Sequence, residues 1–228
     1  MAIELSNILF QYSEQPEHRI LDIPSWKVST GEKVFIHGPS GSGKSTLLSV
    51  ISGLQRPNRG QVSILGSRLD TLSARKRDRF RAQHIGYVFQ QFNLIPYLNT
   101  LDNILLANQF SQAPSKSASM DDIKALLLTL NITKKDWDKP THHLSMGQQQ
   151  RIAIARALIN KPQVFIADEP TSSLDSNNRE SFMELLLSTI AEHPITLIFV
   201  SHDLSLASHF HRVESLNDIN QCGESVSC

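Results

Sequence analysis

The eight residues from Gly38 to Ser45, which read GPSGSGKS, could bind the phosphates of a nucleotide. They fit the phosphate-binding pattern G-x-x-x-x-G-K-[ST] at every defined position. Glycines let the backbone curl so that successive N–H groups face an anion, and a following helix adds partial positive charge. Lys44 could then reach the β- and γ-phosphates, and the Ser45 hydroxyl could be a ligand of Mg²⁺.

The residues around this loop support that chemistry. Apolar residues 33–36, followed by His37, predict a strand, and residues 46–51 predict the first turns of a helix. A glycine- and serine-rich turn could contain a lysine by chance. The order strand, glycine loop, helix favours a phosphate site over such a turn.

A second group of chemically useful residues is the pair Asp168 and Glu169, which follows the apolar run 164–167. Open α/β sheets place their ligands at the carboxyl ends of strands. There Asp168 could hold Mg²⁺ and Glu169 could polarise an attacking water. Since side chains alternate along an extended chain, we expect the two acids to point in different directions and divide these roles. A plain acidic turn before Pro170 is the alternative, and the phosphate loop argues against it.

Composition limits the class of protein. The 228 residues contain 22 basic and 22 acidic side chains, so no overall field attracts nucleic acid or an anionic membrane. We expect a soluble intracellular chain, because no signal peptide or transmembrane segment is visible. Cys222 and Cys228 lack metal-site spacing and could form a disulfide, although a cytosolic protein would keep them reduced.

Apolar strands alternate with helical patterns, which predicts an α/β fold with a parallel sheet. A first group of segments, at 3–10, 27–36 and 61–65, predicts strands of a small antiparallel element beside the phosphate loop. Later strands are predicted at 163–167 and 196–201.

Between these regions the pattern is mostly helical. Helices are predicted at 101–110, 121–130 and 145–159, and a polar, proline-containing loop at 111–119. The arginine-rich stretch 75–81 could suggest phosphate or lipid binding, but its interspersed Asp78 and Phe80 favour a solvated helix face.

The stretch from Leu144 to Arg151, LSMGQQQR, opens a predicted helix that Ser145 could cap. It resembles the LSGGQ signature motif of the ATP-binding cassette (ABC) ATPases. Other elements of that family follow in the expected order over Ile3 to Val213. Tyr12 matches the aromatic residue that stacks on adenine, Gln90 the Q-loop glutamine, residues 172–175 the D-loop and His202 the switch histidine.

Finer likeness connects the chain with the lipoprotein-release (LolD) and macrolide-export (MacB) types of this family. It is carried by residues 53–57, 84–96 and 148–151. In those types a detached ATPase subunit drives a separate membrane permease. The resemblance therefore implies an ATPase that powers export, lipoprotein release or mechanotransmission, with the substrate and direction set by the partner.

The resemblance also implies the architecture. We expect a P-loop NTPase (RecA-like) core with an antiparallel β subdomain and a helical signature-motif subdomain, in a single ABC ATPase domain over residues 1–228. Residues 1–90 and 161–213 would form the nucleotide-binding core and 91–160 the helical subdomain. Residues 214–228 are expected to be a polar C-terminal tail.

The implied cofactors are ATP and Mg²⁺, bound between two copies arranged head to tail. Glu169 would be the general base, His202 would hold the γ-phosphate and the attacking water, and Lys44 and Gln90 would complete the catalytic set. Magnesium would be held by Ser45, Gln90 and Asp168. The residues expected to bind nucleotide are Tyr12, Gly38, Pro39, Ser40, Gly41, Ser42, Gly43, Lys44, Ser45 and Thr46, together with Ser145, Gly147, Gln148 and Asp175, which would act across the interface.

The expected partners are a second copy, integral membrane permease subunits contacted by residues 92–98, and a periplasmic adaptor reached through the permease. The chain would lie at the cytoplasmic face of the inner membrane as a peripheral subunit. A non-transport ABC ATPase acting on nucleic acid or the ribosome is the alternative. The absence of zinc cysteines, a second cassette and a basic footprint argues against it.

Met146 departs from the family pattern, because it replaces the first glycine of the usual signature. A positive φ or close backbone approach at this position would make methionine costly. Since Ser145 and Gly147 are retained, we expect a functional signature. Trp26 and Trp137 are expected to be packing residues, and His142 and His143 surface residues rather than metal ligands.

Overall fold

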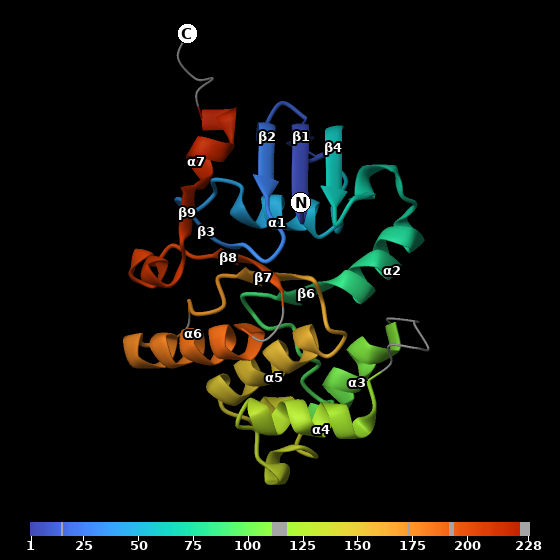
Figure 1. Cartoon of the computed structure of the whole chain (residues 1–228), viewed down its shortest axis with the longest axis vertical. Helices are drawn as coiled ribbons and strands as arrows, with labels where there is room; N and C mark the ends of the chain where they lie inside the picture. The colour runs from blue at the N-terminus through green and yellow to red at the C-terminus, as the bar shows by residue number, and fades with distance from the viewer. Residues whose placement is uncertain (15, 111–117, 173, 192–193, 224–228) are drawn as a thin grey trace. The chain divides into compact units, whose positions relative to one another are not determined.

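The computed structural model describes residues 1–14, 16–110, 118–172, 174–191 and 194–223, which form two compact units (Figure 1). The first unit contains Met1–Asp78 and Thr196–Cys228, and the second contains Arg79–Ile195. The predicted assignment of 1–90 and 161–213 to a nucleotide-binding core, and of 91–160 to a helical subdomain, stays a prediction.

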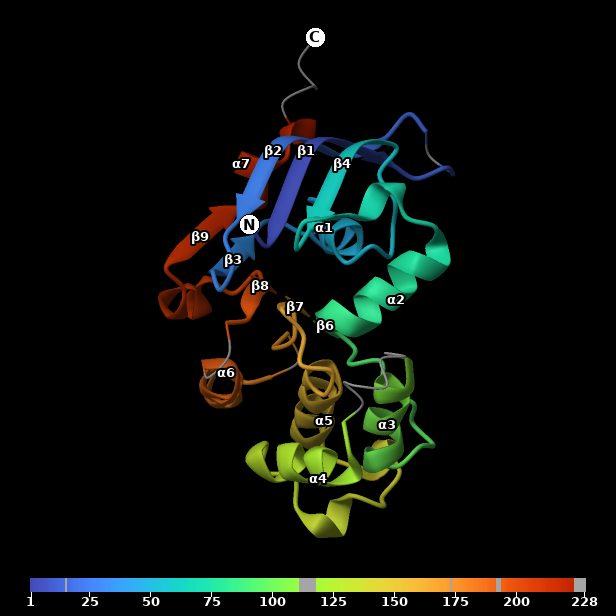
Figure 2. The ribbon, with the colours of Figure 1, turned by 45° about the vertical axis from the view of Figure 1, so that its right-hand side comes forward.

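An antiparallel sheet forms one part of the first unit, with strand order β2-β1-β4-β5. Figure 2 shows β2, β1 and β4 of this sheet side by side. Ile3, Leu5, Ile8 and Phe10 of β1 are buried, and helix α1 contacts β2 and β4. The predicted antiparallel element is therefore present, attached to the helix that follows the phosphate loop. Its strands are β1 (Ile3–Gln11), β2 (Arg19–Val28), β4 (Arg59–Ile64) and β5 (Ser67–Arg68), and α1 spans Lys44–Ile51.

The single strand predicted over 27–36 is wrong, because the chain turns at Gly31, where φ is 77°. The Glu32 amide donates to the Ser29 carbonyl at 3.2 Å, and the Ser29 amide donates to the Glu32 carboxylate at 2.7 Å. Strand β2 ends just before this turn. The sequence pattern did not predict the first half of β2, because Pro24 interrupts the apolar residues. Proline is tolerated there because β2 is an edge strand.

Three parallel strands form the other part of the first unit. Strand β3 (Lys33–His37) lies between β8 (Thr196–Val200) and β9 (Arg212–Ser215), and every residue of β8 is buried. A short 3₁₀ helix, Leu204–His209, precedes β9, and another, Leu69–Thr71, follows β5.

The predicted polar tail is shorter than expected, because residue 214 lies inside β9. Helix α7 (Leu216–Ile219) and the 3₁₀ helix Gln221–Gly223 follow, and both Leu216 and Ile219 are buried. A four-residue helix with two apolar side chains is too short for its hydrophobic pattern to predict it. Cys222 is half-buried and Cys228 lies outside the described residues.

The second unit contains two parallel strands, β6 (Ile85–Val88) and β7 (Val164–Asp168), and a group of helices. Helix α5 contacts β6, α3 and α4, which places it at the centre of the unit. The three predicted helices are confirmed, while residues 111–117 of the predicted loop lie outside the described part. The helices are α3 (Thr100–Phe110), α4 (Met120–Thr129), α5 (Met146–Leu158) and α6 (Ser176–Ala191), with 3₁₀ helices at Lys134–Asp136 and Thr141–His143.

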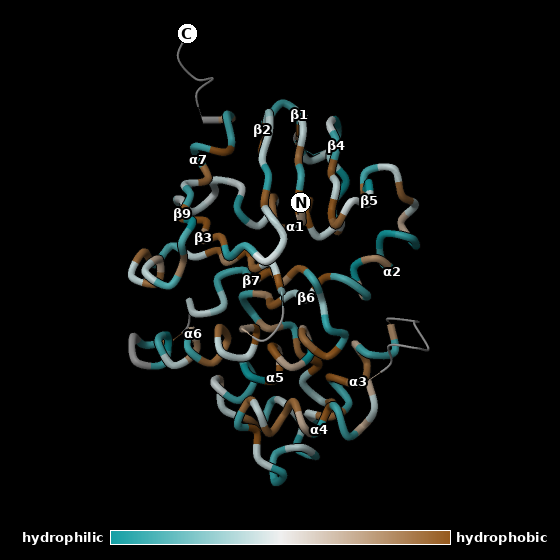
Figure 3. Tube along the Cα trace, in the orientation of Figure 1, coloured by the Kyte–Doolittle hydropathy of each residue, from teal (hydrophilic) through white to brown (hydrophobic). Residues whose placement is uncertain are grey.

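Helix α2 (Ala74–His84) has no buried residue, and Figure 3 shows it as largely hydrophilic. The solvated helix face predicted for residues 75–81 is confirmed. Trp26 and Trp137 are only 4% and 7% exposed, as expected of packing residues. Within the described ranges, no helix is both long and apolar enough to cross a membrane.

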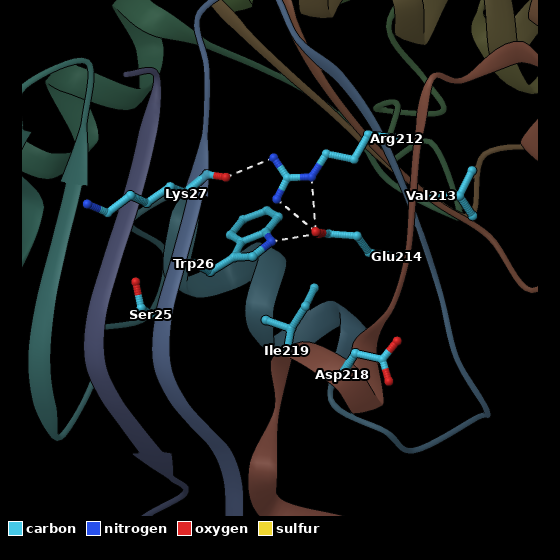
Figure 4. Close-up of a pocket in the computed structure, with 8 residues that line it drawn as sticks. All are labelled: Ser25, Trp26, Lys27, Arg212, Val213, Glu214, Asp218 and Ile219. Carbon is cyan, nitrogen blue, oxygen red and sulfur yellow. Dashed lines mark hydrogen bonds and ion pairs between the residues drawn. The ribbon is translucent and has the colours of Figure 1, made fainter.

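Arg212 connects β9 to β2 in the first unit (Figure 4). Its guanidinium donates to the Lys27 carbonyl at 2.9 Å, to Glu32 at 3.0 Å and to Glu214 at 2.8 Å. Glu214 also accepts from the Trp26 indole at 2.7 Å. Burial raises the pKa of Glu32, but hydrogen bonds from Ser29 and Arg212 outweigh it and leave that pKa lowered.

We expect Arg212→Met to lower the free energy of unfolding by about 2 kcal/mol, because it removes a charged donor from two partly buried carboxylates and from a carbonyl. Urea unfolding measures this value. The difference from the natural sequence should shrink below about pH 4, since a carboxylate with a lowered pKa loses its contribution as it becomes protonated.

The control is Lys27→Met, which removes the exposed 2.8 Å pair with Glu4 and should change stability by less than about 1 kcal/mol. Equal effects of the two substitutions would contradict a structural role for the Arg212 network.

Candidate functional site

The loop from Gly38 to Gly43 joins β3 to α1, as the phosphate-binding pattern predicts. Gly43 caps the helix with a left-handed backbone, at φ 100° and ψ 10°. A Cβ there would also lie 3.1 Å from the Ile20 carbonyl oxygen, so both conformation and space favour glycine. Gly41 is left-handed too, at φ 80°.

The Lys44 side chain folds back over this loop. Its Nζ donates to the carbonyls of Gly38 and Pro39, both at 2.8 Å, and the residue is only 7% exposed. These bonds hold the ammonium at the curled backbone, where an anion bound by the loop would meet it.

Tyr12 lies near the start of α1. Its hydroxyl and that of Thr46 are 3.2 Å apart, and its ring meets Phe10 edge-on at 5.0 Å. The Tyr12 side chain is 42% exposed, so one part of the ring is available for stacking. The first unit thus places Tyr12 beside the helix that the phosphate loop begins.

His202 is an exposed residue just beyond the end of β8. The Ser201 amide before it donates to the Ile36 carbonyl at 3.2 Å, and the Asp203 amide after it donates to the Ser201 hydroxyl at 3.0 Å. Because β8 pairs with β3, His202 follows the strand next to the one that leads into the phosphate loop.

Asn220 is a residue of the first unit that sequence reasoning missed. Its side-chain amide donates to the Ile20 carbonyl at 2.9 Å and to the Ser42 carbonyl at 3.4 Å, and its oxygen accepts from the Asp22 amide at 2.7 Å. The C-terminal segment therefore supports both β2 and the phosphate loop. No local pattern predicts bonds that span about two hundred residues.

In the second unit, Asp168 ends β7 and is 9% exposed. The Tyr87 hydroxyl on β6 donates to its carboxylate at 3.4 Å. Burial, followed by the negative charge of Asp168, raises the pKa of Tyr87, so this phenol stays a proton donor. Tyr87 also stacks on Phe89 at 4.1 Å, which fixes its ring.

Glu169 lies beyond the end of β7 with φ at 44°. The strand ends at Asp168 and the backbone turns left-handed at the next residue, so the alternation of an extended chain does not apply to this pair, and the expectation that the two acids point in different directions stays a prediction. Such a backbone in a non-glycine residue costs about 1–3 kcal/mol and is concentrated at functional sites.

Gln90 is exposed and lies in a tight turn after β6. The Phe92 amide donates to the Phe89 carbonyl at 2.9 Å, and the Asn93 amide donates to the Gln91 carbonyl at 2.6 Å. Phe92 and Asn93 both have positive φ, at 57° and 50°.

The loop from Ile95 to Leu98 is held by polar groups outside it. Asn103, 2% exposed, donates to the carbonyls of Ile95 and Leu98 at 3.1 and 3.2 Å and accepts from the Ile95 amide at 2.8 Å. The Thr141 hydroxyl donates to the Ile95 carbonyl at 3.0 Å. Tyr97 at the tip is 75% exposed, so a rigid loop presents an aromatic ring.

Ser145 caps α5, as predicted, and Gln148 completes a capping box. The Gln148 amide donates to the Ser145 hydroxyl at 3.3 Å, and the Ser145 amide donates to the Gln148 side chain at 2.9 Å. Gln148 also donates to Asp136 at 2.9 Å, so its side chain fixes the start of the helix.

Met146 is the first residue of α5 and has a helical backbone, so the position needs no glycine. Its side chain is 51% exposed. A Cβ at Gly147 would have no neighbour within 4 Å, which leaves the first turn open to another molecule. Gln150, further along α5, donates to the Pro170 carbonyl at 2.8 Å and so connects this helix to the turn after Glu169.

Asp175 lies immediately before α6. It accepts from the Asn178 amide at 2.9 Å and from the Asn178 side chain at 2.7 Å. Ser173 of the predicted D-loop lies outside the described residues.

Each unit holds its own share of the predicted residues. The first contains Tyr12, the loop with Lys44, Ser45 and Thr46, and His202, and the second contains Gln90, Ser145, Gly147, Gln148, Asp168, Glu169 and Asp175. The three groups expected to hold Mg²⁺, a hydroxyl, an amide and a carboxylate, are all hard oxygen donors, which is the chemistry this ion prefers. His142 and His143 are exposed and join no cluster of metal-binding side chains in the part of the chain described.

An open pocket of about 490 Å³ lies in the first unit between β2, β9 and α7 (Figure 4). None of the eight residues that line it is a predicted site residue. Arg212, Glu214 and Trp26 bond to one another there, so the pocket belongs to the structural network described above.

Comparison with known proteins agrees with these features. A family model described as "ABC transporter" matches residues 21–172. The chain is 43% identical over 185 residues to the uncharacterized ABC transporter ATP-binding protein YbbA of Escherichia coli (strain K12), covering 81% of this chain and 80% of the relative. It is 40% identical over 222 residues to the lipoprotein-releasing system ATP-binding protein LolD of Hydrogenovibrio crunogenus, covering 96% and 94%.

A solved structure with the same fold is the dimeric post-hydrolysis state of the ATP-binding cassette MJ0796 bound to ADP and Pi. It has a TM-score of 0.83 and 35% sequence identity, over 93% of each chain. CbiO1 of Clostridium perfringens, part of the transporter complex CbiONQ, matches with a TM-score of 0.80 and 28% identity, over 94% of this chain and 84% of that one.

The helical backbone at Met146 yields a prediction. We expect Met146→Gly to lower the free energy of unfolding by up to about 1 kcal/mol, since glycine weakens a helix, and to leave ATP turnover within about threefold. Urea unfolding and phosphate release measure the two effects. Turnover that is absent in the natural sequence but present in the glycine variant would contradict a functional methionine signature.

Proposed function

Because the chain belongs to the ABC transporter family, as an ATP-binding and ATP-hydrolysing subunit, we propose that two copies hold ATP between them and drive a separate membrane permease. The observation that carries this proposal is the open first turn of α5. Ser145 caps it, Gly147 has free space around it, and a helix N-terminus attracts phosphate.

In this scheme each triphosphate is bound by two copies. The loop Gly38–Ser45 of one copy, with Lys44, holds the phosphates, and Tyr12 stacks on the adenine. Ser145 and Gly147 of the other copy approach the γ-phosphate from the opposite side. The relative MJ0796 was solved as a dimer, which supports the pairing of two copies.

Hydrolysis needs a base, a metal and an aligned water. We assign Glu169 as the general base and His202 as the residue that holds the γ-phosphate and water in register. Mg²⁺ would be held by Ser45, Gln90 and Asp168, and it would neutralise charge on the phosphates. Tyr87 would orient the Asp168 carboxylate toward its ligand. Asp175, at the start of α6, would couple the two sites.

The loop of residues 92–98 is our candidate contact for the permease. The exposed aromatic residue Tyr97 lies at the tip of this loop. Asn103 and Thr141 hold the loop backbone by hydrogen bonds to the Ile95 carbonyl. A loop with a fixed backbone can pass a displacement on to the permease, whereas a flexible loop would change its own conformation instead. The subunit would work at the cytoplasmic face of the inner membrane, and a periplasmic adaptor would be reached only through the permease.

Purification from native membranes in gentle detergent tests the partnership. We expect a multi-span membrane protein to co-purify with the natural chain, and much less of it with Tyr97→Ala. Tight binding of DNA or ribosomes, with no membrane protein retained, would overturn the transport function in favour of a non-transport ATPase.

Glu169→Gln should slow hydrolysis by about a hundredfold or more and accumulate an ATP-bound dimer, because the general base is lost while nucleotide binding remains. Phosphate release and light scattering measure the two effects. The matched control is Glu184→Gln, an exposed glutamate on α6, which should leave both unchanged. A monomer with normal turnover would rule out Glu169 as the base.

Lys44→Ala should weaken ADP binding at least about tenfold, because the ammonium at the phosphate loop is removed. Titration with a fluorescent ADP analogue measures the affinity. Lys76→Ala on the solvated helix α2 is the control and should bind normally. Equal affinity of the two variants would contradict the role assigned to Lys44.

A further inference from the structure

Arg156, near the end of α5, bonds to the turn that follows Gln90. Its Nη1 donates to the Asn93 carbonyl at 2.6 Å and its Nη2 to the Phe92 carbonyl at 2.5 Å. Both contacts lie inside the second unit. One guanidinium fork therefore holds two successive carbonyls, which is a directed arrangement that a lysine could not reproduce.

The charge of Arg156 has no acidic partner among the described residues. Burial lowers its pKa, and no carboxylate acts in the opposite direction. Taking a guanidinium partly out of water without a counter-ion is unfavourable. The two carbonyl dipoles of the turn compensate this charge, so Arg156 is specifically matched to the turn.

The turn needs such support. Phe92 and Asn93 are successive non-glycine residues with left-handed backbones, and each costs about 1–3 kcal/mol. The Phe92 side chain is 3% exposed, so its burial anchors one side of the turn. Arg156 anchors the two carbonyls.

The helix that carries Arg156 also carries the signature residues. Arg156 lies ten residues after Met146, which is about 15 Å along a helix. Ser145 and Gly147 are at the beginning of α5, and the clamp on the turn is near its end. A displacement of this rigid helix would therefore reach the turn.

We propose that Arg156 is a positioning residue that fixes the left-handed turn at Phe92 and Asn93, and so ties Gln90 to the signature helix. The consequence for function rests on the role proposed above for Gln90. When ATP draws the signature helix toward a second copy, the turn moves with it. Gln90 is then set for hydrolysis only when the signature is engaged.

The test compares Arg156→Gln with Arg79→Gln, an exposed arginine on α2 of the same unit, in the full chain. Amide hydrogen exchange reports on the turn directly. In Arg156→Gln we expect exchange over residues 89–94 to rise at least about tenfold, because the strained turn loses its clamp. We expect kcat to fall by a similar factor, while ADP affinity stays within about twofold. Arg79→Gln should change none of these.

A second substitution separates positioning from general stability. Asn93→Gly removes the steric penalty of the left-handed backbone. The double variant Arg156→Gln/Asn93→Gly should therefore recover most of the exchange protection and of kcat. A purely structural loss would not be repaired by one glycine in the turn.

Unchanged exchange over residues 89–94 in a folded Arg156→Gln protein would overturn the proposal. Loss of ADP binding together with failure of the glycine rescue would also overturn it, since Arg156 would then only stabilise the unit. Increased exchange that the glycine repairs, with kcat unchanged throughout, would support the clamp and instead remove the role proposed for Gln90.

Discussion

Three loops that carry predicted site residues follow the carboxyl end of a parallel strand and contain a left-handed backbone. After β3 the turn uses Gly41 and Gly43, after β6 it uses Phe92 and Asn93, and after β7 it uses Glu169. A strand that simply continued would carry its next residues past the sheet edge in an extended line. The left-handed turn keeps them at that edge, where open α/β sheets bind ligands. Side-chain hydrogen bonds help to maintain these three turns.

Each turn is maintained by a long polar side chain that bonds to carbonyl groups. Lys44 bonds to Gly38 and Pro39, Arg156 to Phe92 and Asn93, and Gln150 to Pro170. Carbonyls in a sharp turn cannot join a sheet, and leaving them unpaired in a partly buried place is unfavourable. Two of the three donors come from α5, so one helix stabilises both turns of its unit, and its first residues match the signature motif.

A structural feature could be predicted from the sequence when the residues that form it lie close together along the chain. The phosphate loop, the cap at Ser145 and the strand before Asp168 follow from residues within a few positions of one another, and the structure contains all three elements. Arg156 and Asn220 act on backbone 63 and about two hundred positions away, respectively, where no spacing rule applies. β9 was missed for a related reason, because its partner strand β3 lies far from it in the chain.

The loop that ends in Tyr97 has its shape set by residues that are not part of it. Asn103 and Thr141 hold the backbone at Ile95 and Leu98, whereas the Tyr97 side chain is 75% exposed. Substitutions at this tip change the surface without changing the support. If this loop contacts the permease as proposed, a substitution at the exposed Tyr97 would change that contact and leave the residues of the phosphate loop unchanged. Because the exposed tip and its supporting residues are separate, copies of a duplicated gene could diverge at the tip and keep the same ATPase.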